Sequence, residues 1–461
     1  LAKLKKKYIG DWDFYQKYLL LAIPMILQNA ITNLVSFLDN IMVGQLGTEQ
    51  MSGVAIVNQL IFVYNLAIFG AVSAASIFGA QYFGKGNHKG HMYSFRFKLY
   101  ATLLVTGGAI LLFLTKGSAL ISLYLTDTVG NGATDLALQY GLEYLAIMMV
   151  GLIPFAVNQS YATNIKETGQ TFIPMLASFV AVGTNAILDY LMIFGIGPFP
   201  ELGVQGAALA TVIARYIEAL IVVIWAHIHR GKNRYLEGAY TGFGIPLAEL
   251  KAILIKGFPL MMNEVLWAAG MTTVTQCYSV RGLDVVAGLN IASTITNLFN
   301  IVYLQLGSCI SIVVGQYLGA GKLEDAKDAD NKMIVFSVFC CVIMAALMFV
   351  VGGFFPGIYN TTEEIRELAT SFIAVSAIIM PFCAFSHASY FTLRSGGKTV
   401  VTFLFDSVFT WVIVVPAAYL LAHFTGLGIV SIYFLVQGTE LIKVIIGYLM
   451  VKSNVWVVQM V

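Results

Sequence analysis

The chain has 461 residues, of which 58% are hydrophobic and only 11% are charged. A soluble globular protein is about 25% charged, so this composition excludes a soluble enzyme, a disordered protein and a secreted disulfide scaffold. The 26 basic and 24 acidic residues nearly balance, which gives nucleic acid no reason to bind. We expect a polytopic membrane protein.

Twelve apolar stretches are each long enough to cross a bilayer as a helix, since about 20 residues at ~1.5 Å per residue span a ~30 Å hydrocarbon core. They cover residues 17–43, 51–78, 97–115, 135–160, 171–195, 204–229, 252–278, 286–313, 333–353, 367–391, 399–422 and 427–451. They are too long for buried strands and lack the alternation of an outer-membrane barrel. The sequence therefore predicts an all-α integral membrane protein.

The basic residues predict the orientation of these spans. The N-terminus, the loops after the even-numbered spans and the C-terminus hold 21 of the 26 lysines and arginines, whereas the opposite loops hold only Lys116, Arg281 and Arg366. Cytoplasmic loops of membrane proteins are enriched in basic residues. We therefore expect a multi-pass protein of the cytoplasmic membrane with both termini in the cytoplasm.

An internal repeat relates the two halves of the chain. Displaced by 235 residues, Pro24 falls on Pro259, and residues 81–86 fall on residues 316–321. Each half holds six spans, so both halves enter from the same side, as a parallel repeat about an axis along the membrane normal. We predict two pseudo-symmetric six-helix bundles. The expected domains are an N-lobe at 1–229, a cytoplasmic linker at 230–251 and a C-lobe at 252–461.

Two acidic residues of the N-lobe spans share one depth. Asp39 and Asp189 each lie about 8 Å below the outer end of their span at ~1.5 Å per residue, and Asn185 lies one turn below Asp189 on the same face. These oxygens could coordinate a hard cation such as Na⁺. Alternatively they could hold a proton, because burial and mutual repulsion both disfavour two charged carboxylates. A hydrogen-bonded structural pair is the third possibility.

Other charged residues inside the spans have simpler explanations. Arg215 and Glu218 are three residues apart, as are Glu440 and Lys443, so we expect each pair to neutralise itself along one helix face. Asp406 lies about two turns inside its span, and we expect it to reach cytoplasmic water.

Glu264 is expected near mid-membrane, five residues after Pro259. There its carboxylate would attract cationic substrates or titrate during transport. A capping role at the proline kink is the alternative.

Several segments resemble one family. Residues 24–29 and 38–47 look like the first helix of the multidrug and toxic compound extrusion (MATE) family, and residues 185–195 and 203–211 are similar to its later N-lobe motifs. The resemblance covers nearly the whole chain. It implies a twelve-helix exporter with two six-helix lobes, in which Na⁺ or H⁺ enters as an organic, usually cationic, compound leaves.

The resemblance also implies site residues. Asp39 and Asp189 match the acids of the N-lobe cation site, assisted by positions that match Asn185 and Thr211, and Glu264 matches an acid of the seventh span in other branches. Some of those branches carry an acid in the tenth span, which residues 380–387 lack. His387 would titrate in its place, or else serve as a hydrogen-bonded structural histidine.

We therefore expect a monomeric, secondary active multidrug efflux antiporter that exchanges organic cations for H⁺ or Na⁺ by alternating access, with membrane lipids around it. The sequence carries no metal-ligand cysteine spacing and no hydrolase or nucleotide-binding motif, so we expect neither an enzyme nor a cofactor. The alternative is a flippase of lipid-linked oligosaccharides. Such a protein would line its cleft with arginine and lysine to hold pyrophosphate, whereas only Arg215 and Lys443 are basic residues within the spans.

Overall fold

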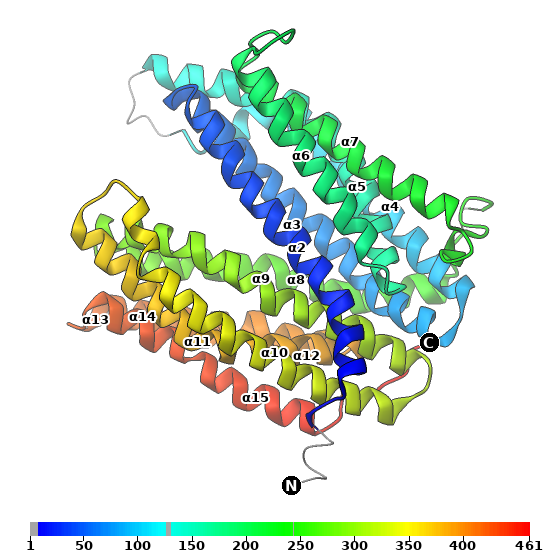
Figure 1. Cartoon of the computed structure of the whole chain (residues 1–461). Coiled ribbons are helices and arrows are strands. Elements are labelled where there is room, and N and C mark those ends of the chain that lie inside the picture. Colours follow the sequence, from blue (N-terminus) through cyan, green and yellow to red (C-terminus); the bar gives the residue numbers. More distant parts are fainter. Residues whose placement is uncertain (1–7, 126–130, 243) are drawn as a thin grey trace. The chain divides into compact units, whose positions relative to one another are not determined.

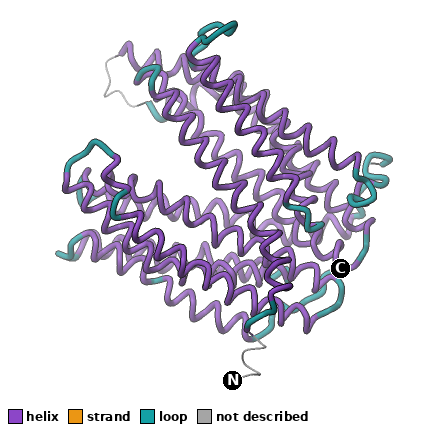
Figure 2. The backbone as a smooth tube through the Cα atoms, viewed as in Figure 1, coloured by secondary structure: helices purple, strands orange, loops and turns teal. Residues whose placement is uncertain are grey.

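The structure is a computed structural model that describes residues 8–125, 131–242 and 244–461, with only the backbone described at 35, 37 and 131–133. Over these residues the secondary structure is helical, without any strand, and loops join the helices (Figure 2). Twelve of the described helical segments are long and apolar enough to cross a membrane. The predicted all-α class and the number of spans are confirmed.

Six of these helices come from the first half of the chain (Figure 1). They are α2 (Trp12–Gly44), α3 (Thr48–Lys85), α4 (His88–Ser122), α5 (Asn131–Glu167), α6 (Phe172–Phe194) and α7 (Val204–Ile228). Several are longer than predicted. The helix α4, for example, begins well before the apolar stretch at 97, because its first turns are polar and hydropathy does not mark them.

The second half begins after the short η1 (Arg234–Leu236) and contains four uninterrupted spans and two interrupted ones. The uninterrupted spans are α8 (Leu247–Ser279), α9 (Leu283–Gly319), α10 (Leu323–Gly352), which is followed by η2 (Phe355–Ile358), and α11 (Glu363–Ser395). The eleventh span consists of α12 (Thr399–Phe403), the π-helical η3 (Leu404–Val408) and η4 (Thr410–Val414), and α13 (Val415–Phe424). The twelfth consists of α14 (Ile429–Gly438) and α15 (Glu440–Lys452).

The helix boundaries follow the repeat seen in the sequence. Displaced by 235 residues, both ends of α2 coincide with the ends of α8, and the start of α3 coincides with the start of α9. The repeat breaks down in the last two spans, because α6 and α7 are continuous whereas their counterparts are interrupted. The two halves therefore share a helical plan but differ in detail.

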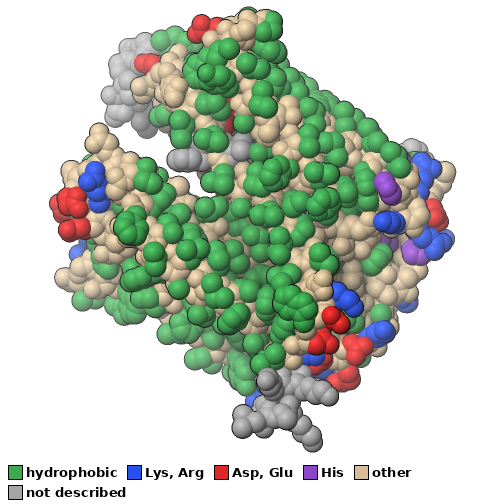
Figure 3. Space-filling view, in the orientation of Figure 1, with side chains coloured by type: hydrophobic (Ala, Val, Ile, Leu, Met, Phe, Trp, Pro, Cys, Tyr) green, Lys and Arg blue, Asp and Glu red, His purple; other side chains and the backbone are tan. Residues whose placement is uncertain are grey.

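The helices expose apolar side chains along their lengths. Leu104 is 78% exposed, Phe258 62% and Val412 64%. On the face drawn in Figure 3, hydrophobic side chains cover the helix sides and charged side chains gather toward helix ends. Such surfaces are stable next to lipid and not next to water, which agrees with twelve spans.

The described chain divides into two compact units by its internal contacts. One contains the segment ending at Ile26, Ala80–Asn87 and Lys251–Val461, and the other contains Leu27–Gly79 and His88–Leu250. We call them the C-unit and the N-unit. The start of α2 and the end of α3 thus pack with the C-unit, although they belong to the first half of the sequence. The lobe boundaries predicted from sequence stay a prediction.

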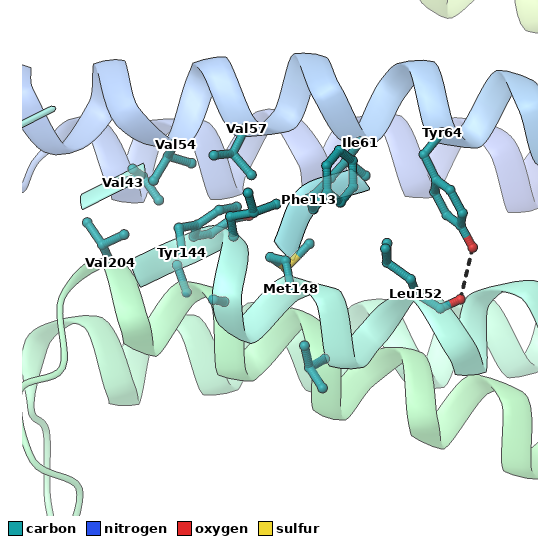
Figure 4. Packing of buried hydrophobic residues seen from close by; sticks show 14 of the residues in the cluster. Val43, Val54, Val57, Ile61, Tyr64, Phe113, Tyr144, Met148, Leu152 and Val204 are labelled. Carbon is teal, nitrogen blue, oxygen red and sulfur yellow. Dashed lines mark hydrogen bonds between the residues drawn. The ribbon is translucent and has the colours of Figure 1, made fainter. Parts of the chain in front are cut away.

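The N-unit core lies where α3, α5 and α7 meet (Figure 4). The helix α5 packs on α4 and α7, and α6 packs on α7. Val57 and Leu152 are almost fully buried in this core, and the Tyr64 hydroxyl donates to the carbonyl of Leu152 at 3.0 Å. In an apolar core a satisfied hydroxyl fixes the register of two helices without leaving an unpaired polar atom.

The C-unit core is built around α11, which packs on α9, α10, α14 and α15. Phe372, Met348 and Ile432 are fully buried there. A central helix buried on several sides presents apolar side chains in more than one direction.

The helices α3 and α9 cross at glycines inside the C-unit. A Cβ atom on Gly84 would lie 1.9 Å from the carbonyl oxygen of Gln316, and one on Gly319 would lie 1.9 Å from the carbonyl oxygen of Gln81. The contact is reciprocal, because Gln81 and Gly84 correspond to Gln316 and Gly319 in the 235-residue repeat. Only glycine allows two helix backbones to approach this closely.

Arg281 fastens the C-terminal end of α13 to the loop after α8. Its guanidinium donates to the carbonyls of Ala422 at 2.7 Å, Leu421 at 3.2 Å and Thr425 at 2.5 Å. The last carbonyls of a helix have no partner within the helix, so this arginine satisfies several of them at once.

We expect Arg281→Ala to lower the free energy of unfolding by about 1.5–3 kcal/mol, because hydrogen bonds from a charged donor would be lost. Thermal unfolding of the purified protein measures the effect. Lys116→Ala, on the exposed part of α4, is the control and should leave the midpoint unchanged. An equal midpoint for both variants would contradict the role given to Arg281.

Candidate functional site

Asp39 of α2 and Asp189 of α6 face each other inside the N-unit. The side chain of Asp189 is fully buried, and the Asp39 carboxyl lies within hydrogen-bonding reach of it. Among the described residues no donor meets Asp39 Oδ1 or either carboxylate oxygen of Asp189 at hydrogen-bond geometry. Two buried carboxylates without donors repel each other unless a proton or a cation is shared between them.

Asn185 and Thr211 complete the set of oxygens predicted for this site. Asn185 adjoins Asp189 one turn earlier on α6, and its Nδ2 donates to Thr211 Oγ1 at 3.4 Å. Thr211 comes from α7, which packs along α6. Because the Asn185 amide nitrogen is turned toward Thr211, its amide oxygen is free to bind a cation, together with the two carboxylates and the Thr211 hydroxyl. This is an all-oxygen set of the kind that hard cations prefer.

The described residues contain no group of three or more His, Cys, Asp or Glu suited to a metal ion. Transition-metal sites usually need such a group.

Tyr144 is a neighbour that the sequence did not reveal. It is buried on α5 within electrostatic range of both Asp39 and Asp189, and its hydroxyl donates to Asn58 Oδ1 at 3.3 Å. A tyrosine in an apolar span looks like a core residue, so periodicity alone could not single it out. Its hydroxyl places a polar group within electrostatic range of the carboxylate pair.

Arg215 and Glu218 do not pair as predicted. Among the described residues Arg215 has no ion pair; its Nη1 donates to the carbonyl of Gly151 at 3.4 Å, and its guanidinium lies 5.1 Å from the centre of the Phe155 ring. Glu218 instead accepts a hydrogen bond from Ser178 Oγ. Packing of α7 against α5 and α6 supplies these partners, and such tertiary contacts override the weak preference for pairing along one helix.

Glu264 and His387 both lie in the C-unit, but no described contact joins them. Glu264 has Arg394 and Asp406 as its electrostatic neighbours. His387 on α11 forms a hydrogen bond between Nδ1 and the carbonyl of Cys383 at 2.9 Å, and its ring lies 4.7 Å from that of Tyr303. This hydrogen bond supports a structural role for His387. A titrating role for His387 stays a prediction.

Asp406 and Lys443 form the ion pair that sequence reasoning missed. Lys443 Nζ donates to Asp406 Oδ1 at 2.6 Å, and both side chains are largely buried. The predicted partner of Lys443 was Glu440, and Asp406 was expected to reach cytoplasmic water; both expectations are wrong. Asp406 lies in the π-helical turn η3, which contacts α15, and sequence periodicity does not reveal such a turn.

A second buried cluster lies near the polar ends of α4 and α5. Glu167 Oε1 accepts a hydrogen bond from Lys98 Nζ at 2.5 Å, and Glu167 Oε2 lies 3.2 Å from His91 Nε2. Asn164 Oδ1 also accepts a hydrogen bond from Lys98 Nζ. Gly79 provides the space, because a Cβ there would lie 2.0 Å from Glu167 Oε2. The cluster joins α3, α4 and α5 at one level.

Comparison with known families decides the broader identity. The MatE family profile matches residues 24–191 and 259–420, which is most of the chain and includes one segment from each half. The chain belongs to the MatE family. The two matched segments begin at Pro24 and Pro259, the positions that the internal repeat relates.

Named relatives and solved structures agree with this membership. The chain is 23% identical over 413 residues to the probable multidrug resistance protein NorM of Thermotoga maritima, covering 89% of this chain and 86% of the relative. It is 24% identical to the probable NorM of Halalkalibacterium halodurans, with 89% and 88% covered. A solved outward-facing multidrug resistance MATE transporter superposes with a TM-score of 0.85 at 20% identity, covering 96% of each chain.

A MOP superfamily transporter from Pyrococcus furiosus also superposes with a TM-score of 0.85 at 20% identity, covering 98% of this chain and 97% of that one. At this identity the likeness shows the fold. Together with the twelve spans, the family membership identifies a multi-pass transporter of the MatE family.

Proposed function

We propose that this MATE transporter is a secondary active antiporter that exports amphipathic organic cations in exchange for H⁺ or Na⁺, with the exchanged ion bound at Asp39 and Asp189. The observation that carries the proposal is the pair of facing carboxylates, of whose four oxygens three are buried without a hydrogen-bond partner among the described residues. Charged groups inside a membrane are costly and mark ion or substrate pathways. Here the pair would gain its missing positive charge from the exchanged ion.

Asn185 and Thr211 would assist the pair with an amide and a hydroxyl oxygen. Exchange then requires that the ion and the organic cation favour different conformations, because a ligand with equal affinity for two states shifts nothing. The helix α2 could convey this difference. It carries Pro24 inside the helix and passes from the C-unit to the N-unit after Ile26, and a proline weakens the backbone ladder at that point.

Purified protein in liposomes tests the proposal directly. We expect export of an amphipathic cationic dye such as ethidium to accelerate when a pH gradient or a Na⁺ gradient, imposed separately, drives the matching ion inward. The ion that drives export is the coupling ion. Equal export with and without both gradients would rule out antiport while leaving family membership intact.

The distribution of basic residues along the sequence indicates how the protein is oriented in the membrane. With basic residues concentrated on one side, both termini would face the cytoplasm of the cell membrane. We propose a monomer surrounded by lipid, with no cofactor. Accessibility of single cysteines introduced near each terminus, probed in intact cells, checks the orientation.

One observation favours the flippase alternative, and another speaks against it. Arg215 has no ion pair among the described residues, as a pyrophosphate-binding base would require, but Lys443 is occupied by Asp406. A single arginine held by a carbonyl and an aromatic ring does not make the basic lining that a pyrophosphate needs. Efflux of organic cations is the better supported function.

A further inference from the structure

The ammonium group of Lys443 on α15 lies in a cage formed by a carboxylate, Asp406, and two aromatic rings, Phe405 and Phe409. These surroundings would also suit a free ammonium ion. Its Nζ donates to Asp406 Oδ1 at 2.6 Å, and the ring centres of Phe405 and Phe409 lie 5.4 Å and 6.0 Å away. Only 8% of the Lys443 side chain and 15% of the Asp406 side chain are exposed. A carboxylate beside aromatic faces is the arrangement by which proteins hold organic ammonium groups.

The other side of the carboxylate is fixed by α8. Asn263 Nδ2 donates to Asp406 Oδ2 at 3.1 Å, and Ser407 Oγ donates to Asn263 Oδ1 at 2.8 Å. Asp406 Oδ2 is therefore held by α8, while Oδ1 faces the ammonium. The carboxylate is positioned by groups other than Lys443, so its geometry does not depend on which cation lies at Oδ1.

Both members of the pair lie where a membrane helix is irregular. Asp406 lies inside the π-helical η3, and Lys443 lies one turn after Thr439, which separates α14 from α15. Interrupted helices in transporters leave backbone groups free of the regular ladder and are the usual places where small cations bind. An ordinary structural ion pair needs no such interruption.

The charges around the cage favour a cation. Glu440, one turn before Lys443, has its Oε1 buried without a partner among the described residues. Glu440 is an electrostatic neighbour of Lys443, and His387 is an electrostatic neighbour of both Lys443 and Asp406. Removing the ammonium would leave the buried Asp406 carboxylate unneutralised, and such a cavity attracts a positive ion.

We propose that Lys443 is a tethered cation, which fills a monovalent-cation site of the primary-ammonium class in the C-terminal half. Asp406, Asn263, Phe405 and Phe409 form this site. The half then carries its own positive charge and takes none from solution. If the proposed function holds, the exchanged ion binds only at Asp39 and Asp189.

The site is tested by truncating the Lys443 side chain and supplying the lost atoms as a free molecule in solution. Lys443→Ala removes three methylenes and the ammonium, which together correspond to n-propylammonium. The test is made in an Asp39→Asn/Asp189→Asn background, so that its result is independent of the N-unit carboxylates and of the proposed function. We expect n-propylammonium chloride to raise the thermal midpoint of Lys443→Ala by about 2–4 °C over equal NaCl, since a ligand of the folded state stabilises it.

Four controls define the result. The parent background and Lys452→Ala, at the exposed end of the same helix, should show no difference between the two salts. Tetramethylammonium, which has no N–H to donate to Asp406, should not stabilise Lys443→Ala. Adding Asp406→Asn to Lys443→Ala should abolish the n-propylammonium effect.

The absence of a shift in folded Lys443→Ala, or an equal shift in the parent, overturns the proposal. If Lys443→Ala does not fold in NaCl, the yield of monodisperse protein from membranes solubilised in each salt replaces the midpoint. Recovery only in n-propylammonium then supports the tethered cation, and equal loss in both salts overturns it.

Discussion

Asp39→Asn should reduce ion-driven export by about 5–150-fold, the range of typical coupling free energies between two sites. Asparagine keeps the size of the side chain but removes the charge that the buried pair uses to hold a cation. The measurement is dye export from proteoliposomes under the gradient that drives the native protein. Asp13→Asn, in the exposed first turn of the same helix, should export at the native rate.

The same variant should not be less stable than the native protein. Removing one of two buried like charges relieves their repulsion, so its thermal midpoint in the absence of the exchanged ion should stay level or rise. Asp189→Asn should lose export and keep its thermal midpoint in the same way as Asp39→Asn. The double variant should export no less than either single variant, since the two carboxyls act as one unit. Native, gradient-dependent export by Asp39→Asn would reject the site.

The second large effect is expected at the glycine crossing. A methyl group on Gly84 or Gly319 would meet a backbone carbonyl at 1.9 Å, so α3 and α9 would have to move apart. Overpacking of this kind costs about 1–3 kcal/mol per site, or about 2–4 °C of thermal midpoint for each kcal/mol. Thermal unfolding of Gly84→Ala and Gly319→Ala, singly and together, measures it.

Gly108→Ala is the matched control for both variants. Gly108 lies inside α4, and a Cβ atom added there would have nothing within 4 Å of it. Alanine is a better helix former than glycine by about 1 kcal/mol, so this change should be neutral or stabilising. If all three glycine variants behave alike, close packing at the crossing is refuted.

The spans and the repeat could be predicted because both follow from length and hydropathy, which the bilayer constrains strongly. The meeting of Asp39 and Asp189 could also be predicted. Two carboxylates at one depth on helices of one bundle must avoid lipid, and the interior of the bundle is the remaining place. Thr211 followed from the family resemblance and not from its spacing.

The partners of Lys443 could not be predicted in this way. Spacing along a helix favoured Glu440, whereas the structure pairs the lysine with Asp406 of another span. Asp406 lies in the π-helical turn at Leu404–Val408, where the facing of a residue does not follow the regular helical period. The same limit applies to Arg215, because tertiary packing and not local sequence selects Gly151 and Phe155.

The crossing of α3 and α9 also bears on how such a chain could have arisen. Gln81 and Gly84 meet Gln316 and Gly319, so each side of the contact presents the same pair of residues to the other. This is the self-complementary form of an interface between identical subunits related by two-fold symmetry. An ancestral six-helix protein with this glycine face would have been able to dimerise through it, and gene fusion would have preserved the contact inside a single polypeptide.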